Sequence, residues 1–169
     1  MQHVLSRKYI LLISFSGVLI ALDQLTKVFV HTQFQLHESV AVIDHFFHLT
    51  YVRNFGAAFG FLSQTPHLFR EIFFLSMPPI ACLIILYIMR GTDDANTKQI
   101  LSLSAIFGGA IGNYIDRIQY RYVIDFLDFH IYGKYSWPAF NIADMAIVLG
   151  VIALLYFMVT EKEKKAARV

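Results

Sequence analysis

Two aspartates in the second half of the chain have the surroundings of a catalytic carboxyl pair. Asp125 lies in an apolar tetrapeptide, Val-Ile-Asp-Phe at residues 123–126, and Asp144 ends the segment Phe-Asn-Ile-Ala-Asp at residues 140–144, where an apolar helix begins. Two carboxyl groups close together in a medium of low dielectric constant share one proton, so one serves as general base on water and the other as general acid. This is the chemistry of aspartic peptide hydrolysis.

The pattern of these two segments also has a structural interpretation. Asp144 can be a negative charge in the first turn of a helix, where it stabilises the helix dipole, and Asp125 can be an ordinary loop residue. The segments taken alone leave both interpretations open.

Other charged and amide side chains gather near one end of the predicted helices: Asp23, Lys27, Asn113, Asp116, Arg117 and Asn141. Such groups are costly near a bilayer and usually functional. The spacing of Asp23 and Lys27 also suits an ion pair that neutralises itself, and Arg117 can extend to the lipid headgroups. Because these residues collect at one depth, the sequence predicts a site at the outer surface that acts on a membrane-embedded substrate.

Metal-dependent and nucleophilic chemistry find little support in the sequence. His37 and Glu38 begin like a zinc-protease motif, but position 41 is Ala, so the second histidine is missing. No Gly-x-Ser-x-Gly segment is present, and Cys82, the one cysteine, lies in the middle of an apolar stretch. The sequence therefore predicts no metal and no cofactor.

The composition indicates a membrane protein. Of 169 residues, 57% are hydrophobic and 15% charged, and the mean hydropathy is +0.55, whereas soluble domains contain roughly 25% charged residues. The 14 Lys and Arg against 12 Asp and Glu are too evenly balanced to indicate nucleic-acid binding. We therefore expect an α-helical integral membrane protein that forms one membrane domain over residues 1–169.

Four apolar stretches predict transmembrane helices at about residues 9–30, 71–89, 98–115 and 142–160. A spanning helix needs about 20 residues, and only the second stretch reaches that length without polar neighbours. Lys and Arg divide 8 to 6 in favour of the side that holds the two termini, which predicts cytoplasmic termini. Residues 31–70 and 116–141 would then be extracytoplasmic.

The two outer segments have structure of their own in this prediction. Residues 40–43 and 46–52 are rich in β-branched and aromatic residues and predict a small β-sheet. The glycine-punctuated residues 54–60 suit a half-inserted loop. In the third helix, Gly108 and Gly112 have the small-xxx-small spacing that lets two helices approach closely.

Five segments in order resemble the motifs of the lipoprotein signal peptidases (signal peptidase II), which are bacterial inner-membrane aspartic endopeptidases. The resemblance covers about residues 23–159. Its motifs are Asp-Gln-x-x-Lys at 23–27, Asn-Phe-Gly-Ala-Ala-Phe at 54–59, Gly-Asn-Tyr-Ile-Asp-Arg at 112–117, and the two aspartate segments at 123–126 and 140–144.

The resemblance implies a role for each matching residue. Asp125 and Asp144 would be the catalytic pair. The residues expected to line or support the site are Asn54, Gly56, Asn113, Arg117, Asn141, Asp23, Lys27 and Asp116. The substrate would be a prolipoprotein whose cysteine carries a diacylglyceryl group, cleaved on the N-terminal side of that cysteine.

The resemblance also implies a location and a set of partners. The protein would be a multi-pass protein of the bacterial inner membrane, with its site facing the periplasm. Its partners would be prolipoproteins and membrane lipid. The family suggests a monomer, although the Gly108 to Gly112 face could equally join two copies.

Two rival functions give different expectations. A small proton-coupled transporter would use the Asp and Lys residues as an ion relay and would show an inverted repeat, which the sequence lacks. A lipid-binding or assembly factor would hold acyl chains with its aromatic residues and use the aspartates only to cap helices. Replacing Asp125 or Asp144 by Asn distinguishes the enzyme from both.

Overall fold

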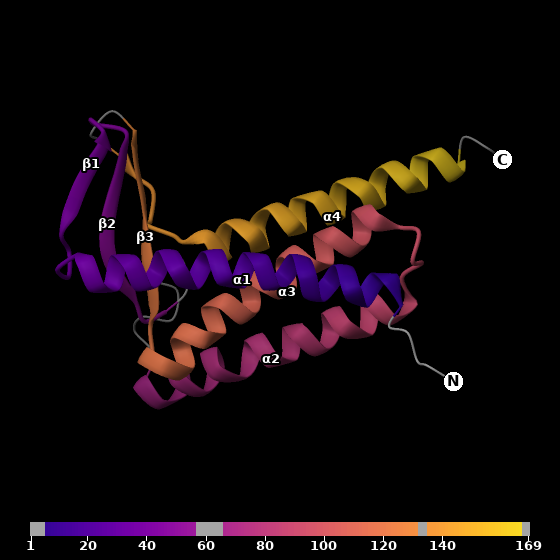
Figure 1. Cartoon of the computed structure of the whole chain (residues 1–169), viewed down its shortest axis with the longest axis horizontal. Coiled ribbons are helices and arrows are strands. Elements are labelled where there is room, and N and C mark those ends of the chain that lie inside the picture. The colour runs from indigo at the N-terminus through magenta and orange to yellow at the C-terminus, as the bar shows by residue number, and fades with distance from the viewer. Residues whose placement is uncertain (1–5, 57–65, 132–134, 167–169) are drawn as a thin grey trace.

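Four long helices run beside one another, and a small sheet stands across one end of them (Figure 1). This computed structural model describes residues 6–56, 66–131 and 135–166. The helices are α1 (Arg7–Gln33), α2 (His67–Gly91), α3 (Thr97–Tyr120) and α4 (Ile142–Ala166). Helix α1 begins, and α4 ends, at the end of the bundle away from the sheet (Figure 1).

Helix α3 is the centre of the bundle, because it packs against α1, α2 and α4. Its glycines permit this close packing. A Cβ atom added at Gly108 would come within 3.1 Å of the Ser16 backbone on α1, and one at Gly109 would collide with the carbonyl oxygen of Ala143 on α4. The predicted close approach is thus present, and α3 uses neighbouring glycines to approach two different helices.

The sheet has the strand order β1-β2-β3-β4 with antiparallel neighbours. Its strands are β1 (Ser39–Ile43), β2 (Phe47–Asn54), β3 (Val123–Ile131) and β4 (Tyr135–Ser136). The first two confirm the predicted strands. The third was not predicted, and it places Asp125 on a strand paired with Val52 of β2 rather than in a loop.

The four helices lie where the sequence predicted them, with one extension that matters for the site. Helix α3 continues to Tyr120, so Asp116 and Arg117 lie in its last turns and not in an outer segment. Among the described residues, α1, α2 and residues 142–160 of α4 are long and apolar enough to cross a membrane. Most of the predicted half-inserted loop, residues 57–60, lies outside the described residues.

Candidate active site

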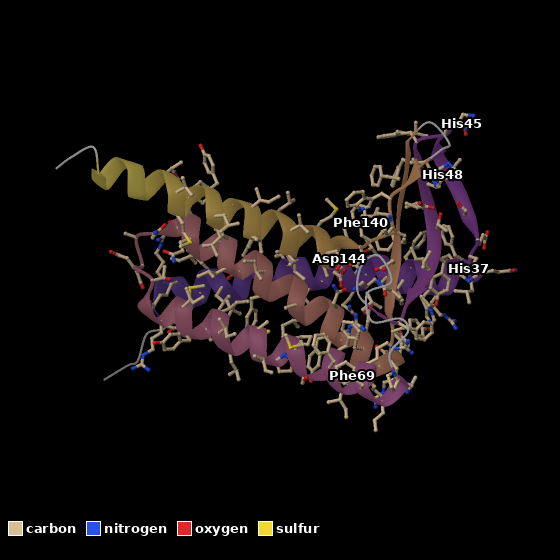
Figure 2. All side chains as sticks on the ribbon, turned by 180° about the vertical axis from the view of Figure 1, so that it is seen from behind. His37, His45, His48, Phe69, Phe140 and Asp144 are labelled. Carbon is tan, nitrogen blue, oxygen red and sulfur yellow. The ribbon has the colours of Figure 1, made fainter. Side chains whose placement is uncertain are left out.

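Asp125 and Asp144 open into one cavity at the junction of the helices and the sheet. Asp125 is on β3 with 2% of its surface exposed, and Asp144 is half-buried in the first turn of α4. Both line a cavity of about 1230 Å³. Figure 2 shows Asp144 at the start of α4, facing the sheet, with Phe140 nearby.

Three asparagines hold the two carboxyl groups through their side-chain amides. The Asn54 Nδ2 atom donates to Asp125 Oδ2 at 2.9 Å, and Asn141 Nδ2 donates to Asp125 Oδ1 at 2.7 Å. The Asn113 Nδ2 atom donates to Asp144 Oδ1 at 2.7 Å. These amides come from β2, α3 and the residue before α4, so three separate parts of the fold contribute to the position of the pair.

The orientation of each amide is fixed because its carbonyl oxygen already accepts from a strong donor. Asn54 Oδ1 accepts the backbone N–H of Gly56 at 3.0 Å, and Asn113 Oδ1 accepts from the Lys27 ammonium at 2.9 Å. Asn141 Oδ1 accepts the backbone N–H of Asp144 at 2.9 Å. Each NH₂ group must therefore face a carboxyl group.

Asn141 and Asp144 also form a reciprocal cap at the start of α4. The carboxyl of Asp144 accepts the backbone N–H of Asn141 at 3.3 Å, which returns the hydrogen bond that Asn141 accepts. This is the geometry of a capping box. The helix-start interpretation of Asp144 is therefore correct as local structure, and it is compatible with a position in the cavity.

The pKa of Asp125 is raised to about 7, first by burial and then by the nearby negative charge of Asp144, while the amides of Asn54 and Asn141 and the charge of Lys27 oppose the shift. A carboxyl group with this pKa is partly protonated at neutral pH. A pair of this kind can keep one shared proton near neutral pH, which is what acid–base hydrolysis by two carboxyl groups requires.

A buried ion cluster lies directly beneath the pair. The Lys27 Nζ atom is 2.8 Å from Asp23 Oδ2 and 3.1 Å from Asp116 Oδ2. All three side chains are only 1% exposed. The predicted ion pair between Asp23 and Lys27 is therefore present, and Asp116 is a second carboxylate partner of the same ammonium group.

The two carboxylates of this cluster also hold backbone near the catalytic candidates. Asp23 Oδ1 accepts the N–H of Ala143 at 2.9 Å. Asp116 Oδ2 accepts the N–H of Ile124 at 3.0 Å. Asp116 thus takes part in the site through the strand that carries Asp125.

Arg117 forms part of the cavity wall near the start of the glycine-rich segment. It donates from Nη2 to the carbonyl oxygen of Gly56 at 2.9 Å, and its guanidinium lies 4.3 Å from the ring centroid of Phe74 on α2. Arg117 therefore connects α3, α2 and the end of β2, instead of extending to the headgroups.

The rest of the cavity wall is mostly apolar. Along α4 it is lined by Met145, Ile147, Val148 and Leu149, and opposite them by Trp137, Pro138, Ala139 and Phe140. Met145, Val148 and Leu149 are at least 40% exposed. The polar part of the cavity around the two carboxyl groups thus continues into an apolar surface on a helix that can span a membrane.

The structure brings all the predicted site residues into one continuous hydrogen-bonded network. Sequence reasoning missed two neighbours. The Gln24 Nε2 atom donates to Asp116 Oδ1 at 2.9 Å and to the carbonyl oxygen of Gly112 at 3.0 Å, and Phe74 covers Arg117. The place of Gln24 between Asp23 and Lys27 in the first motif was the available signal for it, whereas nothing marked Phe74 among many phenylalanines.

Three of the histidines lie clearly away from this network. His37, His45 and His48 are on the sheet side of the molecule, apart from Asp144 (Figure 2). In the part of the chain that the structure describes, no group of three or more His, Cys, Asp or Glu side chains is placed to hold a metal ion.

Comparison with known proteins gives one consistent result. A family model described as signal peptidase (SPase) II matches residues 15–160. A lipoprotein signal peptidase of Syntrophus aciditrophicus is 45% identical over 96% of this chain and 100% of the relative. Another, of Desulforapulum autotrophicum, is 47% identical over 87% of this chain and 90% of the relative.

Solved structures agree with these relatives. One bacterial membrane enzyme superposes with a TM-score of 0.81 at 32% identity, over 91% of this chain and 90% of that chain. A second gives a TM-score of 0.76 at 33% identity, over 87% and 91%. The carboxyl pair, the apolar helices and these likenesses lead to one conclusion: the chain belongs to the signal peptidase II family, the membrane aspartic peptidases that remove signal peptides from prolipoproteins.

Proposed function

We propose that Asp125 and Asp144 are the catalytic pair of this peptidase, and that it cleaves diacylglyceryl-modified prolipoproteins on the N-terminal side of the lipidated cysteine. One observation carries the proposal. Both carboxyl groups open into the same cavity, and each accepts a side-chain amide N–H from an asparagine whose orientation is fixed. The arrangement holds two carboxyl groups ready for a water molecule and a peptide bond.

The reaction follows from a pair that shares one proton. The ionised carboxyl group removes a proton from water, and the water oxygen attacks the carbonyl carbon of the scissile bond. The protonated carboxyl group donates to the carbonyl oxygen, which gives a tetrahedral gem-diol. When the C–N bond breaks, the leaving amine takes a proton from the carboxyl group that removed one from water. A hydroxyl of the gem-diol gives its proton to the carboxyl group that protonated the carbonyl oxygen, so both groups return to their starting states.

The apolar wall of the cavity supports a lipidated substrate. Met145, Val148 and Leu149 lead from Asp144 along the exposed face of α4. Acyl chains that stay in the bilayer can lie against this face while the peptide bond lies at the carboxyl pair. Two acyl chains then position the substrate before any peptide contact forms.

We infer that α3 is a fourth spanning helix, which the other three helices shield from lipid. Many of its residues are buried, among them Ile100, Leu103 and Ser104, so it needs less apolar surface than an exposed span. With four spans both termini lie on the same side of the membrane, and the excess of Lys and Arg on that side favours the cytoplasm. The site then faces the periplasm of the inner membrane, and the exposed apolar residues of α4 beside the cavity suit contact with lipid.

Purified Asp125→Asn and Asp144→Asn variants test the proposal on a diacylglyceryl-modified prolipoprotein. The exposed Asp44 lies in the turn after β1, and Asp44→Asn is the matched control. We expect both site variants to lose cleavage and the control to keep it. Wild-type-rate cleavage by either site variant would refute the catalytic pair. Ion flux through reconstituted wild-type protein, without cleavage, would favour the transporter.

A further inference from the structure

We propose that Asp23, Lys27 and Asp116 form a clamp that sets the separation of the two catalytic carboxyl groups. In this account the three are positioning residues, which act on the reaction without contacting the substrate. The inference rests on the proposed function, because it takes Asp125 and Asp144 to be the pair that reacts.

The two ends of the clamp hold equivalent points. Asp23 accepts the backbone N–H of Ala143, the residue immediately before Asp144, at 2.9 Å. Asp116 accepts the backbone N–H of Ile124, the residue immediately before Asp125, at 3.0 Å. Each catalytic candidate thus has its preceding peptide N–H bound to its own buried carboxylate.

Lys27 joins the two ends. Its ammonium group lies 2.8 Å from Asp23 and 3.1 Å from Asp116. A short path therefore runs from the backbone beside Asp144 through Asp23, Lys27 and Asp116 to the backbone beside Asp125. The same ammonium donates to Asn113 at 2.9 Å, and Asn113 donates to Asp144, so Lys27 also fixes one side chain of the pair.

Gln24 braces the same path from the next position along α1. Its Nε2 atom is 3.2 Å from Asp23 Oδ2 and 2.9 Å from Asp116 Oδ1. The NH₂ group therefore bridges the two carboxylates in parallel with Lys27. Two bridges between the same carboxylates restrict their relative movement more than one ion pair does.

Stability alone is a weak reason for such a cluster. Burying charges costs desolvation free energy, and replacing a buried ion group by apolar side chains is often neutral or stabilising. The three side chains here are 1% exposed, so this cost applies in full. Fixed geometry next to the reacting groups gives the cluster a use that apolar packing cannot supply.

The separation of the pair matters because the charge of one carboxyl group opposes ionisation of the other. This coupling weakens as the distance grows, so the gap between the two macroscopic pKa values of the pair reports their separation. The charged groups that surround the pair are Asp23 and Lys27 on α1, Arg70 on α2, Asp116 and Arg117 on α3, Arg53 on β2 and Asp128 on β3. A variant that releases the clamp should let the two carboxyl groups move apart. The two apparent pKa values, which set the acidic and basic limbs of the pH–rate profile, should then lie closer together.

The test compares Asp116→Leu with Asp116→Asn in the full-length protein, with a diacylglyceryl-modified prolipoprotein as substrate. Leucine removes the acceptor for the Ile124 N–H, whereas asparagine can keep it through its carbonyl oxygen. We expect Asp116→Leu to lower kcat by about 100-fold, as a displacement of about 1 Å can, with KM nearly unchanged. Its pH limbs should move closer together, and Asp116→Asn should restore most of kcat and of the profile.

Gly112→Ala moves the other end of the clamp with every charge in place. A Cβ atom at Gly112 would lie 2.6 Å from Asp23 Oδ2 and 3.2 Å from the Ala143 Cβ atom. Gly17→Ala on α1 is the matched control, because nothing lies within 4 Å of its added Cβ atom. We expect a lower kcat and narrowed limbs for Gly112→Ala only, and this variant decides the question if Asp116→Leu does not fold.

If the folded clamp variants keep the pH–rate profile and the kcat of the wild type, the proposed clamp is wrong. The proposed function would stand in that case, provided that the wild type cleaves and Asp125→Asn does not. Loss of cleavage in the wild type itself would instead remove the function on which the clamp rests.

Discussion

At the scale of single residues, the site depends on asparagines as much as on aspartates. In Asn54, Asn113 and Asn141 the side-chain oxygen accepts a hydrogen bond from a fixed donor, and the NH₂ group donates one to a carboxyl group. An aspartate in any of these positions could not donate, and it would add a negative charge beside the pair. The amides therefore offset part of the free-energy cost of burying the carboxyl groups, without adding a charge that would neutralise them.

The raised pKa of Asp125 predicts a pH-dependent stability. Its pKa is about 7 in the folded protein against 3.8 for an ordinary aspartate, so between these values the folded protein holds the proton more tightly than the unfolded chain. The free energy of unfolding therefore falls as the pH rises from about 4 to about 7.

The measurement is the change in Tm between pH 5 and pH 8 in a fixed detergent. We expect a steeper fall for the wild type than for Asp125→Asn, because the variant lacks the titrating group. Comparing slopes removes the pH-independent cost of placing an amide there, and Asp44→Asn should follow the wild type. Equal slopes in wild type and Asp125→Asn would mean that Asp125 titrates normally.

Sequence reasoning could name individual candidate residues that the structure brings together, because they belong to short motifs with fixed spacing. It could not derive their partners. Nothing in the chain indicates that Asp116 binds the N–H of Ile124 or that Gln24 bridges two carboxylates. Such contacts depend on how α1 and α3 meet β3, which is a property of the packed molecule.

At the scale of elements, α3 determines how closely the helices that carry the candidate site approach one another. Gly108 faces α1, Gly109 faces α4, and Gly112 faces both. The sequence predicted a close approach from the glycine spacing but not its partners, because Gly109 falls outside the small-xxx-small pair. The third strand, β3, was not predicted for a related reason: its pairing with β2 joins segments far apart in the sequence, so no local pattern reveals the partner.

Gly109→Ala should destabilise the protein. Its Cβ atom would collide with the carbonyl oxygen of Ala143 and lie 2.7 Å from Ile147 Cγ1, so α3 and α4 would have to separate. We expect the free energy of unfolding to fall by about 1–3 kcal/mol, as for other overpacked cores. The Tm and the rate of cleavage should fall with it. Gly17→Ala is the control, and an unchanged Tm for Gly109→Ala would show that this interface can adapt.

At the scale of the whole molecule, the bundle is closed at the end opposite the site. Arg7 donates to the carbonyl oxygen of Asp94 at 2.5 Å, and Lys8 donates to the carbonyl oxygens of Arg90 and Thr92 at 2.9 and 2.8 Å. The start of α1 thus holds the α2–α3 connection. Arg7 and Lys8 lie at this end, which is the cytoplasmic end in the proposed orientation.

Cysteine labelling in intact cells tests this orientation. Cys82, the one cysteine of the sequence, lies in α2 and is 7% exposed, and Cys82→Ala supplies the background. Asp44 in the β1–β2 turn and Asp93 in the α2–α3 connection are both exposed. We expect a membrane-impermeant maleimide that reaches the periplasm to label Asp44→Cys directly and Asp93→Cys only after lysis. Direct labelling of Asp93→Cys, with labelling of Asp44→Cys only after lysis, would show that the orientation is the opposite of the proposed one.

The central claim is that Asp125 and Asp144 together hydrolyse one peptide bond beside a lipidated cysteine. Its most direct test is mass spectrometry of a diacylglyceryl-modified prolipoprotein incubated with wild type, Asp125→Asn, Asp144→Asn and the control Asp44→Asn. We predict cleavage immediately before the lipidated cysteine by wild type and control, and an intact substrate with both site variants. Cleavage at the wild-type rate by either site variant would contradict the account.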